Sequence, residues 1–265
     1  MADADVTEGI DGSDPALDLR DRVVIVTGGT RGIGLGAAVH LGRRGARVTI
    51  TGRRPDRLAQ ASERLDAEGI DHLALVADVA DRDRARTLVD DTIERFGRLD
   101  GLVCNAQSFR PVTALVDVTE SDMDLLFDTG PKGTLWLMQA AHPHFATRRW
   151  GRIVTMGTSM GLTGAPGYGP YAASNEAIRS LTRTAAREWG KAGIRVNTVL
   201  PSALTPKSIW YLEDSGTYDL ELSKVAMGRF GTPEDIAPTC LFLASDESNF
   251  VTGQTIGAEG GAVML

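Results

Sequence analysis

The sequence predicts an α/β fold, a doubly wound parallel sheet of about seven strands with helices on both faces. Residues 23–27 form a β-branched run that suits a strand buried on both sides, and this run leads directly into a glycine-rich turn. Helical segments of about 10–15 residues separate that strand from those that follow. Right-handed crossovers between parallel strands have this alternating pattern, so the whole body is expected to form one sheet.

Each strand is expected where an apolar run follows a helical segment, often after a glycine or a turn. The expected strands cover residues 23–27, 47–51, 72–77, 101–105, 152–156, 195–200 and 255–257. The expected helices cover residues 33–44, 56–68, 81–96, 121–146, 171–189 and 233–244. Thr119 with Asp122, and Thr232 with Pro233, are typical caps for the starts of the fourth and last helices. Pro131 is expected to bend the long fourth helix.

Composition narrows the function classes. The chain of 265 residues has 28 Lys and Arg against 35 Asp and Glu, a net charge of −7, which argues against nucleic-acid binding. It contains no apolar run of about 18 residues and no secretory signal pattern, so we expect no membrane contact and a cytoplasmic location. Cys104 and Cys240 lie far apart and outside any metal-ligand spacing, so neither a disulfide nor a metal site is expected.

The first residues differ from the rest of the chain. Residues 1–19 contain six acidic side chains and no Lys or Arg, interspersed with Gly, Ser and Pro. This composition predicts a disordered leader, with an acidic docking tail as the alternative. No linker interrupts residues 20–265, which we expect to form a single domain.

The turn after the first strand has the features of a dinucleotide site. Gly28, Gly32 and Gly34 stand between a strand and a helix, where glycine lets the backbone turn tightly and approach a pyrophosphate. A structural turn without a ligand is the alternative. The second strand ends in Gly52-Arg53-Arg54, with no acidic residue to hold ribose hydroxyls. Arg53 or Arg54, with Arg31 opposite, could pair with a 2′-phosphate, so the cofactor predicted is NADP(H). Solvated surface arginines are the alternative here.

Several motifs together resemble the short-chain dehydrogenase/reductase family. They are the glycine turn, Asn105-Ala106 after the fourth strand, Tyr171-Ala-Ala-Ser-Asn175, Pro201, and the segments 228–236, 241–246 and 251–254. The resemblance covers nearly everything after residue 20. It implies a Rossmann-like fold, a nicotinamide cofactor, a small-molecule substrate, and a homotetramer or homodimer built on helices 121–146 and 171–189. The cofactor-binding residues that it implies, with those of the turn and the arginines, are Gly28, Thr30, Arg31, Gly32, Ile33, Gly34, Arg53, Arg54, Asp78, Val79, Asn105, Ala106, Tyr171, Asn175, Pro201 and Thr205.

The catalytic positions depart from the family pattern. Where the family has Asn, Ser, Tyr and Lys, this sequence has Gly130, Thr158, Tyr171 and Asn175. Ser159 competes with Thr158 for the hydroxyl role. In the family the lysine lowers the pKa of the tyrosine, and Asn175 brings no charge. Gln107 stands where the family has glycine after Asn-Ala, and Ser202 stands where glycine follows the proline.

Two functions follow from these residues. One is NADPH-dependent reduction of a ketone, with Tyr171 as proton donor. The other is binding of NADP(H) or a related ligand without redox turnover, or a cyclase-like or dehydratase-like reaction with Tyr171 as acid. Residues 202–227, with Ile209, Trp210, Tyr211, Leu212 and Tyr218, have the composition of a substrate lid. A lid of this kind favours a mid-sized, largely apolar substrate, and ordinary packing is the alternative.

Overall fold

The computed structural model describes residues 17–110, 112–204 and 216–264. These residues form a parallel seven-stranded sheet in the order β3-β2-β1-β4-β5-β6-β7. This order confirms the predicted doubly wound fold. The strands are β1(Val23–Thr27), β2(Arg47–Gly52), β3(His72–Val76), β4(Gly101–Cys104), β5(Gly151–Met156), β6(Ile194–Pro201) and β7(Thr255–Ala258).

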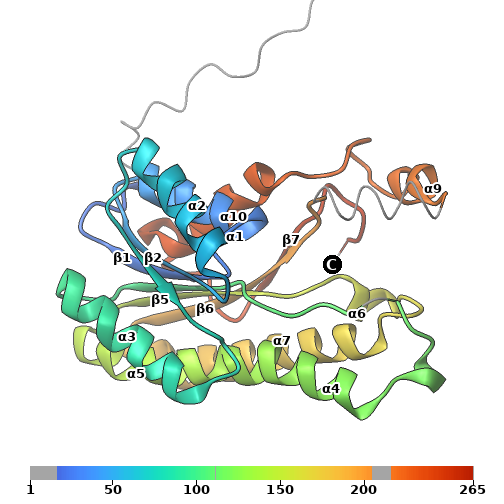
Figure 1. The fold of residues 1–265 in the computed structure, drawn as a ribbon, viewed down its shortest axis with the longest axis horizontal. Coiled ribbons are helices and arrows are strands. Elements are labelled where there is room, and N and C mark those ends of the chain that lie inside the picture. The colour runs from blue at the N-terminus through green and yellow to red at the C-terminus, as the bar shows by residue number, and fades with distance from the viewer. Residues whose placement is uncertain (1–16, 111, 205–215, 265) are drawn as a thin grey trace, which may run out of the picture.

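Helices pack on both faces of the sheet, as Figure 1 shows. One face carries α1(Gly32–Arg43), α2(Pro55–Ala67) and α10(Pro233–Ala244), and the other carries α3(Arg82–Phe96), α5(Gly133–Arg148) and α7(Gly169–Trp189). Successive residues of β1 enter opposite cores: Val24 and Val26 pack on the α1 side, and Val23 and Ile25 on the α3 side. The β-branched run is therefore buried on both faces, which is why it shows no polar alternation.

The expected long helix over residues 121–146 is wrong as a single element. It consists of α4(Glu120–Phe127), the π-helical turn η3(Asp128–Lys132) and α5. Thr119 and Asp122 form the predicted capping box at its start. Pro131 lies inside η3. Proline lacks the N–H that a regular helix needs, which explains a change of hydrogen-bond pattern at the place where a bend was predicted.

The predicted boundary of the leader at residue 19 is placed too late. Leu19 is buried, its N–H donates to the carbonyl of Arg44, and Leu17 packs against the α1-side core. An apolar residue in an otherwise acidic stretch was the available signal. Residues 1–16 lie outside the described part of the chain, so the disordered leader remains a prediction for them.

We expect a deletion of residues 1–19 to destabilise the protein more than a deletion of residues 1–16. Burying a leucine side chain contributes about 1.5–3 kcal/mol, and only the longer deletion removes Leu19. Thermal unfolding of both truncated proteins beside the full chain measures the difference. Equal melting temperatures for the two deletions would contradict the role given to Leu19.

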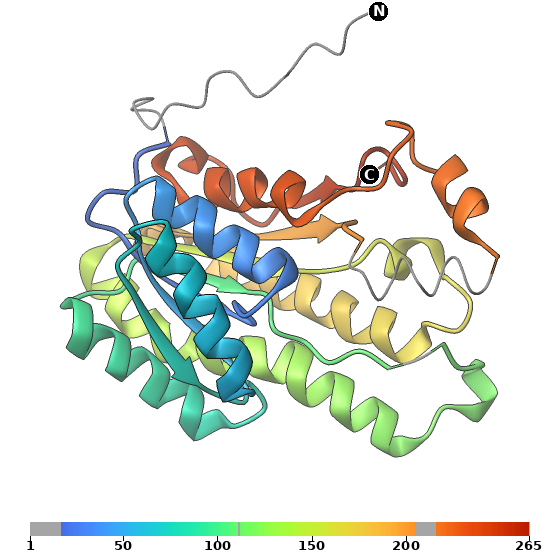
Figure 2. The same cartoon turned by 45° about the horizontal axis from the view of Figure 1, so that its top comes forward.

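Shorter elements complete the described fold. They are the helices α6(Met160–Thr163) and α9(Tyr218–Ser223) and the 3₁₀ turns η2(Leu115–Asp117), η4(Gly190–Ala192) and η5(Asp246–Ser248). Figure 2, in which α10 (red) lies beside α1 (blue), shows α9 at the end of the molecule away from α3. Of the predicted lid, residues 205–215 lie outside the described chain. Tyr218 packs edge-on against Phe230, with ring centroids 5.2 Å apart. In the part of the chain that the structure describes, no helix is long and apolar enough to cross a membrane.

Candidate active site

The predicted site residues gather at one edge of the sheet, where the parallel strands end. The glycine turn follows β1, Arg53 follows β2, Asn105 follows β4, and Thr158 follows β5. Asp78 and Val79 follow β3, and Pro201 is the last residue of β6. Ligands of doubly wound sheets bind outside the carboxyl ends of the strands, and this is the edge that the predicted residues occupy. Thr205 lies outside the described residues.

Asn105 holds the glycine turn in place. Its Nδ2 donates to the carbonyls of Thr27 at 3.0 Å and Gly28 at 3.3 Å, and its N–H bonds the Thr27 hydroxyl. A Cβ at Gly28 would lie 2.8 Å from that Nδ2, and one at Gly34 would lie 2.5 Å from it. The close approach of Asn105 therefore requires glycine at both positions, a requirement that spacing alone did not reveal.

The start of α1 offers free backbone donors. Arg31 is its N-cap, and no side chain caps the first turn. The helix N-terminus consequently presents N–H groups and the positive end of the helix dipole toward the site. This geometry fits the pyrophosphate of a dinucleotide, as the sequence predicts.

The end of β2 packs directly against the glycine turn. Gly29 N donates to the carbonyl of Thr51, and a Cβ at Gly52 would lie 2.5 Å from Thr30. Arg31 and Arg53 follow these contacting residues in the chain, and both are exposed. Arg54 is engaged elsewhere, in an ion pair of 2.6 Å with Asp56.

Asp78 and Val79 lie in the loop after β3. In the sheet β3 lies on one side of β1, which carries the glycine turn, and β5 lies on the other. The Asp78 carboxylate accepts the N–H of Ala80, which fixes the loop. A Cβ at Gly133 would lie 2.7 Å from the Val79 carbonyl, so the first turn of α5 approaches this loop closely. Asp78, Val79 and Gly133 line a small pocket together with Thr27.

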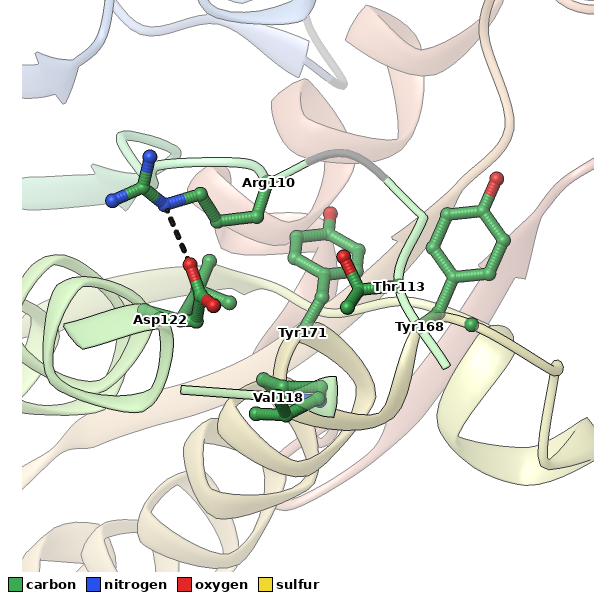
Figure 3. Close-up of a pocket in the computed structure, with 9 residues that line it drawn as sticks. Arg110, Thr113, Val118, Asp122, Tyr168 and Tyr171 are labelled. Atoms are coloured by element: carbon green, nitrogen blue, oxygen red, sulfur yellow. Dashed lines mark ion pairs between the residues drawn. The ribbon is translucent and has the colours of Figure 1, made fainter. Parts of the chain in front are cut away.

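Tyr171 lies in the first turn of α7 and lines a second pocket together with Tyr168, Arg110 and Asp122. Figure 3 shows both phenol rings projecting from the α7 end with their hydroxyls on the same side, beside the ion pair of Arg110 and Asp122. Phe109 packs edge-on against Tyr171, with centroids 5.3 Å apart. Burial raises the pKa of the Tyr171 phenol, and the Asn175 side chain lowers it in part. The phenol is therefore protonated at neutral pH.

Asn175 is fully buried one turn after Tyr171. Its Nδ2 donates to the backbone carbonyl of Tyr171 at 2.8 Å. Its Oδ1 has no hydrogen-bond partner in the described chain. Buried acceptors almost always have a hydrogen-bond donor, which for this oxygen a bound ligand could supply. A ribose hydroxyl is such a donor. The residues present thus fit a nicotinamide nucleotide, because a ribose hydroxyl could donate to the unpaired Oδ1 of Asn175.

Two hydroxyls follow β5, and their surroundings differ. Thr158 is buried, and its hydroxyl accepts the N–H of Met160 at 3.4 Å. Ser159 approaches Glu259, a buried residue after β7. Burial raises the pKa of Glu259, and the Ser159 hydroxyl lowers it in part. Ser159 therefore has a partner on the β7 side, and Thr158 does not share it.

Sequence reasoning missed Phe109, Arg110 and Glu259. Their contacts join segments far apart in the chain, and nothing local marks them. Cys104 and Cys240 are buried, and burial raises the pKa of both thiols to about 12. Across the described residues there is no group of three or more side chains suited to hold a metal ion.

Comparisons with known proteins agree with this geometry. Residues 28–263 match the family model described as enoyl-(acyl carrier protein) reductase. The 3-oxoacyl-[acyl-carrier-protein] reductase FabG of Staphylococcus aureus is 36% identical over 91% of this chain and 97% of its own. The 12alpha-hydroxysteroid dehydrogenase of a Clostridium species is 37% identical over 91% of this chain and 96% of its own. The crystal structure of a putative short-chain alcohol dehydrogenase from Sinorhizobium meliloti has a TM-score of 0.89 at 35% identity, covering 94% of this chain and 98% of that one. The chain belongs to the short-chain dehydrogenase/reductase family of oxidoreductases, which use nicotinamide cofactors.

Proposed function

We propose that this protein is an NADPH-dependent reductase of a mid-sized, largely apolar ketone. The observation that carries the proposal is the position of Tyr171. Its phenol is protonated because burial raises its pKa, and it lines a pocket with Tyr168, Arg110 and Asp122. Asn175, whose buried Oδ1 has no partner among the described residues, lies one turn further along α7. A protonated phenol at this place can donate a proton to the oxygen of a carbonyl as negative charge develops there.

Each residue of the candidate site has a separate role in the proposed reaction. When bound, the reduced nicotinamide would supply the hydride. Tyr171 and Thr158 hold the carbonyl oxygen, and the Tyr171 hydroxyl gives up its proton to it. Asn175 Oδ1 would accept a hydrogen bond from a ribose hydroxyl and so position the nucleotide without adding charge. The uncapped N-terminus of α1 would bind the pyrophosphate.

An apolar substrate is supported by the residues around the pocket. Phe109, Val112 and Leu115 are exposed, and Phe109 packs edge-on against Tyr171. Val112 lies against Gly167 and Leu115 against Gly169, which places this loop over the start of α7. Exposed apolar side chains beside a pocket favour a ligand with an apolar body. Two relatives named for a 3-oxoacyl group and a hydroxysteroid support the same substrate class.

Assembly as a homodimer or homotetramer through α4, α5 and α7 is part of the proposal, as the resemblance implies. Size-exclusion chromatography with light scattering measures it.

The preference for NADPH is expected to depend on Arg53. Within the described part of the chain Arg53 forms no ion pair, unlike Arg54, which is paired with Asp56. Together with Arg31, Arg53 can bind a 2′-phosphate by charge-assisted hydrogen bonds. Such a bond contributes about 1.5–3 kcal/mol, so Arg53→Ala should reduce the ratio of NADPH to NADH affinity by about tenfold or more. Arg54→Ala is the matched control and should change the ratio less. Equal affinity of the unchanged protein for both nucleotides would reject the assignment.

The alternative function is favoured by one observation, the absence of a cation at position 175. A protein that only binds NADP(H), or one that runs cyclase-like or dehydratase-like chemistry, could keep Tyr171 and dispense with that charge. The two are separated by following reduced-nicotinamide absorbance with a panel of 3-oxoacyl thioesters, steroid ketones and cyclic ketones. Oxidation of NADPH with any of them supports the reductase. Tight NADPH binding with no oxidation across the panel favours the alternative.

A further inference from the structure

The space beside Gly130 is filled by another side chain. It lies in η3 and is buried, and its backbone does not adopt a positive φ. A Cβ at this position would lie 2.8 Å from Nε2 of Gln107 and 3.4 Å from its Cδ. Real Cβ atoms essentially never approach a neighbour this closely, so the carboxamide of Gln107 occupies the space into which a side chain at position 130 would point.

Gln107 connects this space to the start of α7. Its Nε2 donates to the hydroxyl of Ser174 at 2.8 Å, although the two residues are 67 positions apart. The Ser174 hydroxyl in turn donates to the carbonyl of Tyr171 at 2.9 Å, beside the bond from Asn175 to the same carbonyl. Ser174 is fully buried, so without Gln107 its hydroxyl oxygen would lose its donor in a place that water does not reach.

A second bond joins the loop after β4 to the segment that carries Gly130. The N–H of Ser108 donates to the hydroxyl of Thr129 at 3.0 Å, and that hydroxyl donates to the carbonyl of Leu125 at 2.7 Å. The loop after β4 is thus bonded to the α4–η3 segment at Ser108 and to α7 at Gln107. The Gln107 carboxamide, in the loop after β4, therefore lies beside Gly130 of η3 and is bonded to Ser174 of α7.

We propose that Gln107 and Gly130 form a matched pair, in which the Gln107 carboxamide fills the space over Gly130 and, through Ser174, positions the turn of α7 that carries Tyr171. Gln107 is then a positioning residue for the proton donor. The inference rests on the proposed function for its effect on turnover. The pairing of the two residues does not depend on that function.

A double-mutant cycle in stability tests the pairing without any turnover. Gly130→Ala should lower the melting temperature, because the added Cβ displaces the carboxamide and breaks its bond to Ser174. In the Gln107→Gly background the same change should be neutral or stabilising, because the space is free and alanine favours helix over glycine. Gly190→Ala is the control, since a Cβ there meets nothing within 4 Å. Additive effects of the two changes would overturn the pair.

Positioning of Tyr171 is tested by the phenol itself and by kinetics. Gln107→Gly should loosen the first turn of α7 and bring the pKa of Tyr171 down toward its ordinary value. Ultraviolet titration, taken as the difference from the Tyr171→Phe protein, measures this shift. Arg110 and Asp122, the charged groups in the same pocket, stay unchanged in all variants. Gln107→Gly should also lower kcat for ketone reduction about tenfold, with KM for NADPH unchanged.

Recovery of activity by a second substitution separates loss of Tyr171 positioning from general destabilisation of the protein. Gln107→Gly with Gly130→Asn places a carboxamide in the same space from the opposite side, and should recover most of the loss in kcat and of the shift in pKa. If Gln107→Gly leaves both unchanged, or if the double variant recovers neither, the positioning role is wrong. If the unchanged protein reduces no ketone, the proposed function fails, while the stability cycle and the titration still decide the inference.

Discussion

Replacing Asn175 by lysine is expected to raise alcohol oxidation at neutral pH, by as much as the 10²–10⁴-fold typical of a working acid–base group. Oxidation needs Tyr171 as a phenolate, and burial raises the pKa of that phenol above its ordinary value, so the unchanged protein should oxidise alcohols only at strongly alkaline pH. A nearby ammonium favours the phenolate and lowers its pKa by about 1–3 units. The alkaline limb of the oxidation profile should move to lower pH by that amount.

Ketone reduction responds in the opposite sense. It needs the protonated phenol, so in the unchanged protein its rate should stay flat from about pH 6 to 9. In Asn175→Lys it should begin to fall at a lower pH. Rates of both directions, measured across pH at saturating NADP(H), give the two profiles.

Asn175→Met is the matched control, because methionine has a long side chain without charge. A gain in oxidation equal to that of the lysine variant would show that charge is not the cause. A further gain from an asparagine at position 130 requires Gln107→Gly as well, because Gln107 fills that space. If the lysine variants stay inert toward every carbonyl and alcohol while NADPH remains bound, the binding or non-redox function becomes the better account.

Removing only the Tyr171 hydroxyl, in Tyr171→Phe, is expected to lower ketone reduction by about 10²–10⁴-fold. The phenylalanine ring keeps the edge-on contact with Phe109, and the backbone carbonyl still accepts Ser174 and Asn175. NADPH affinity and melting temperature should therefore change little. Steady-state kinetics, fluorescence titration with NADPH and thermal unfolding measure the three quantities.

Tyr168→Phe is the comparison within the same pocket. Its hydroxyl lies on the same side as that of Tyr171, yet it is not the proposed proton donor (Figure 3). It should lose less than tenfold. Similar losses in both variants would indicate that the pocket binds substrate through either phenol, and would contradict the assignment of Tyr171.

The seven strands and the main helices were predictable because their signals are local. Val23–Thr27 is β-branched throughout, and Thr232 with Pro233 forms the predicted helix start. The break in the long helix was predictable only as a bend at Pro131. Its form as a π-helical turn depends on how α4 and α5 pack, which a local pattern does not encode.

The site was predictable as a set of positions and not as a set of contacts. Spacing marks Gly28 and Gly34, but the reason for them is Asn105, which lies more than 70 residues further along. Gln107 stood out only as a departure from the family pattern, and its partners Gly130 and Ser174 come from two other elements. Contacts of this kind depend on the assembled sheet, so no local pattern in the sequence could predict them.

The hydrogen bonds from Asn105 to the glycine turn favour tight and fast binding of a nucleotide. The side-chain amide of Asn105 donates to the backbone carbonyls of Thr27 and Gly28, so these bonds hold the turn in shape without a ligand. Association with a nucleotide therefore loses little conformational entropy in this segment. The free energy of the phosphate contacts is then available almost in full as affinity, and the encounter needs no slow rearrangement of the loop.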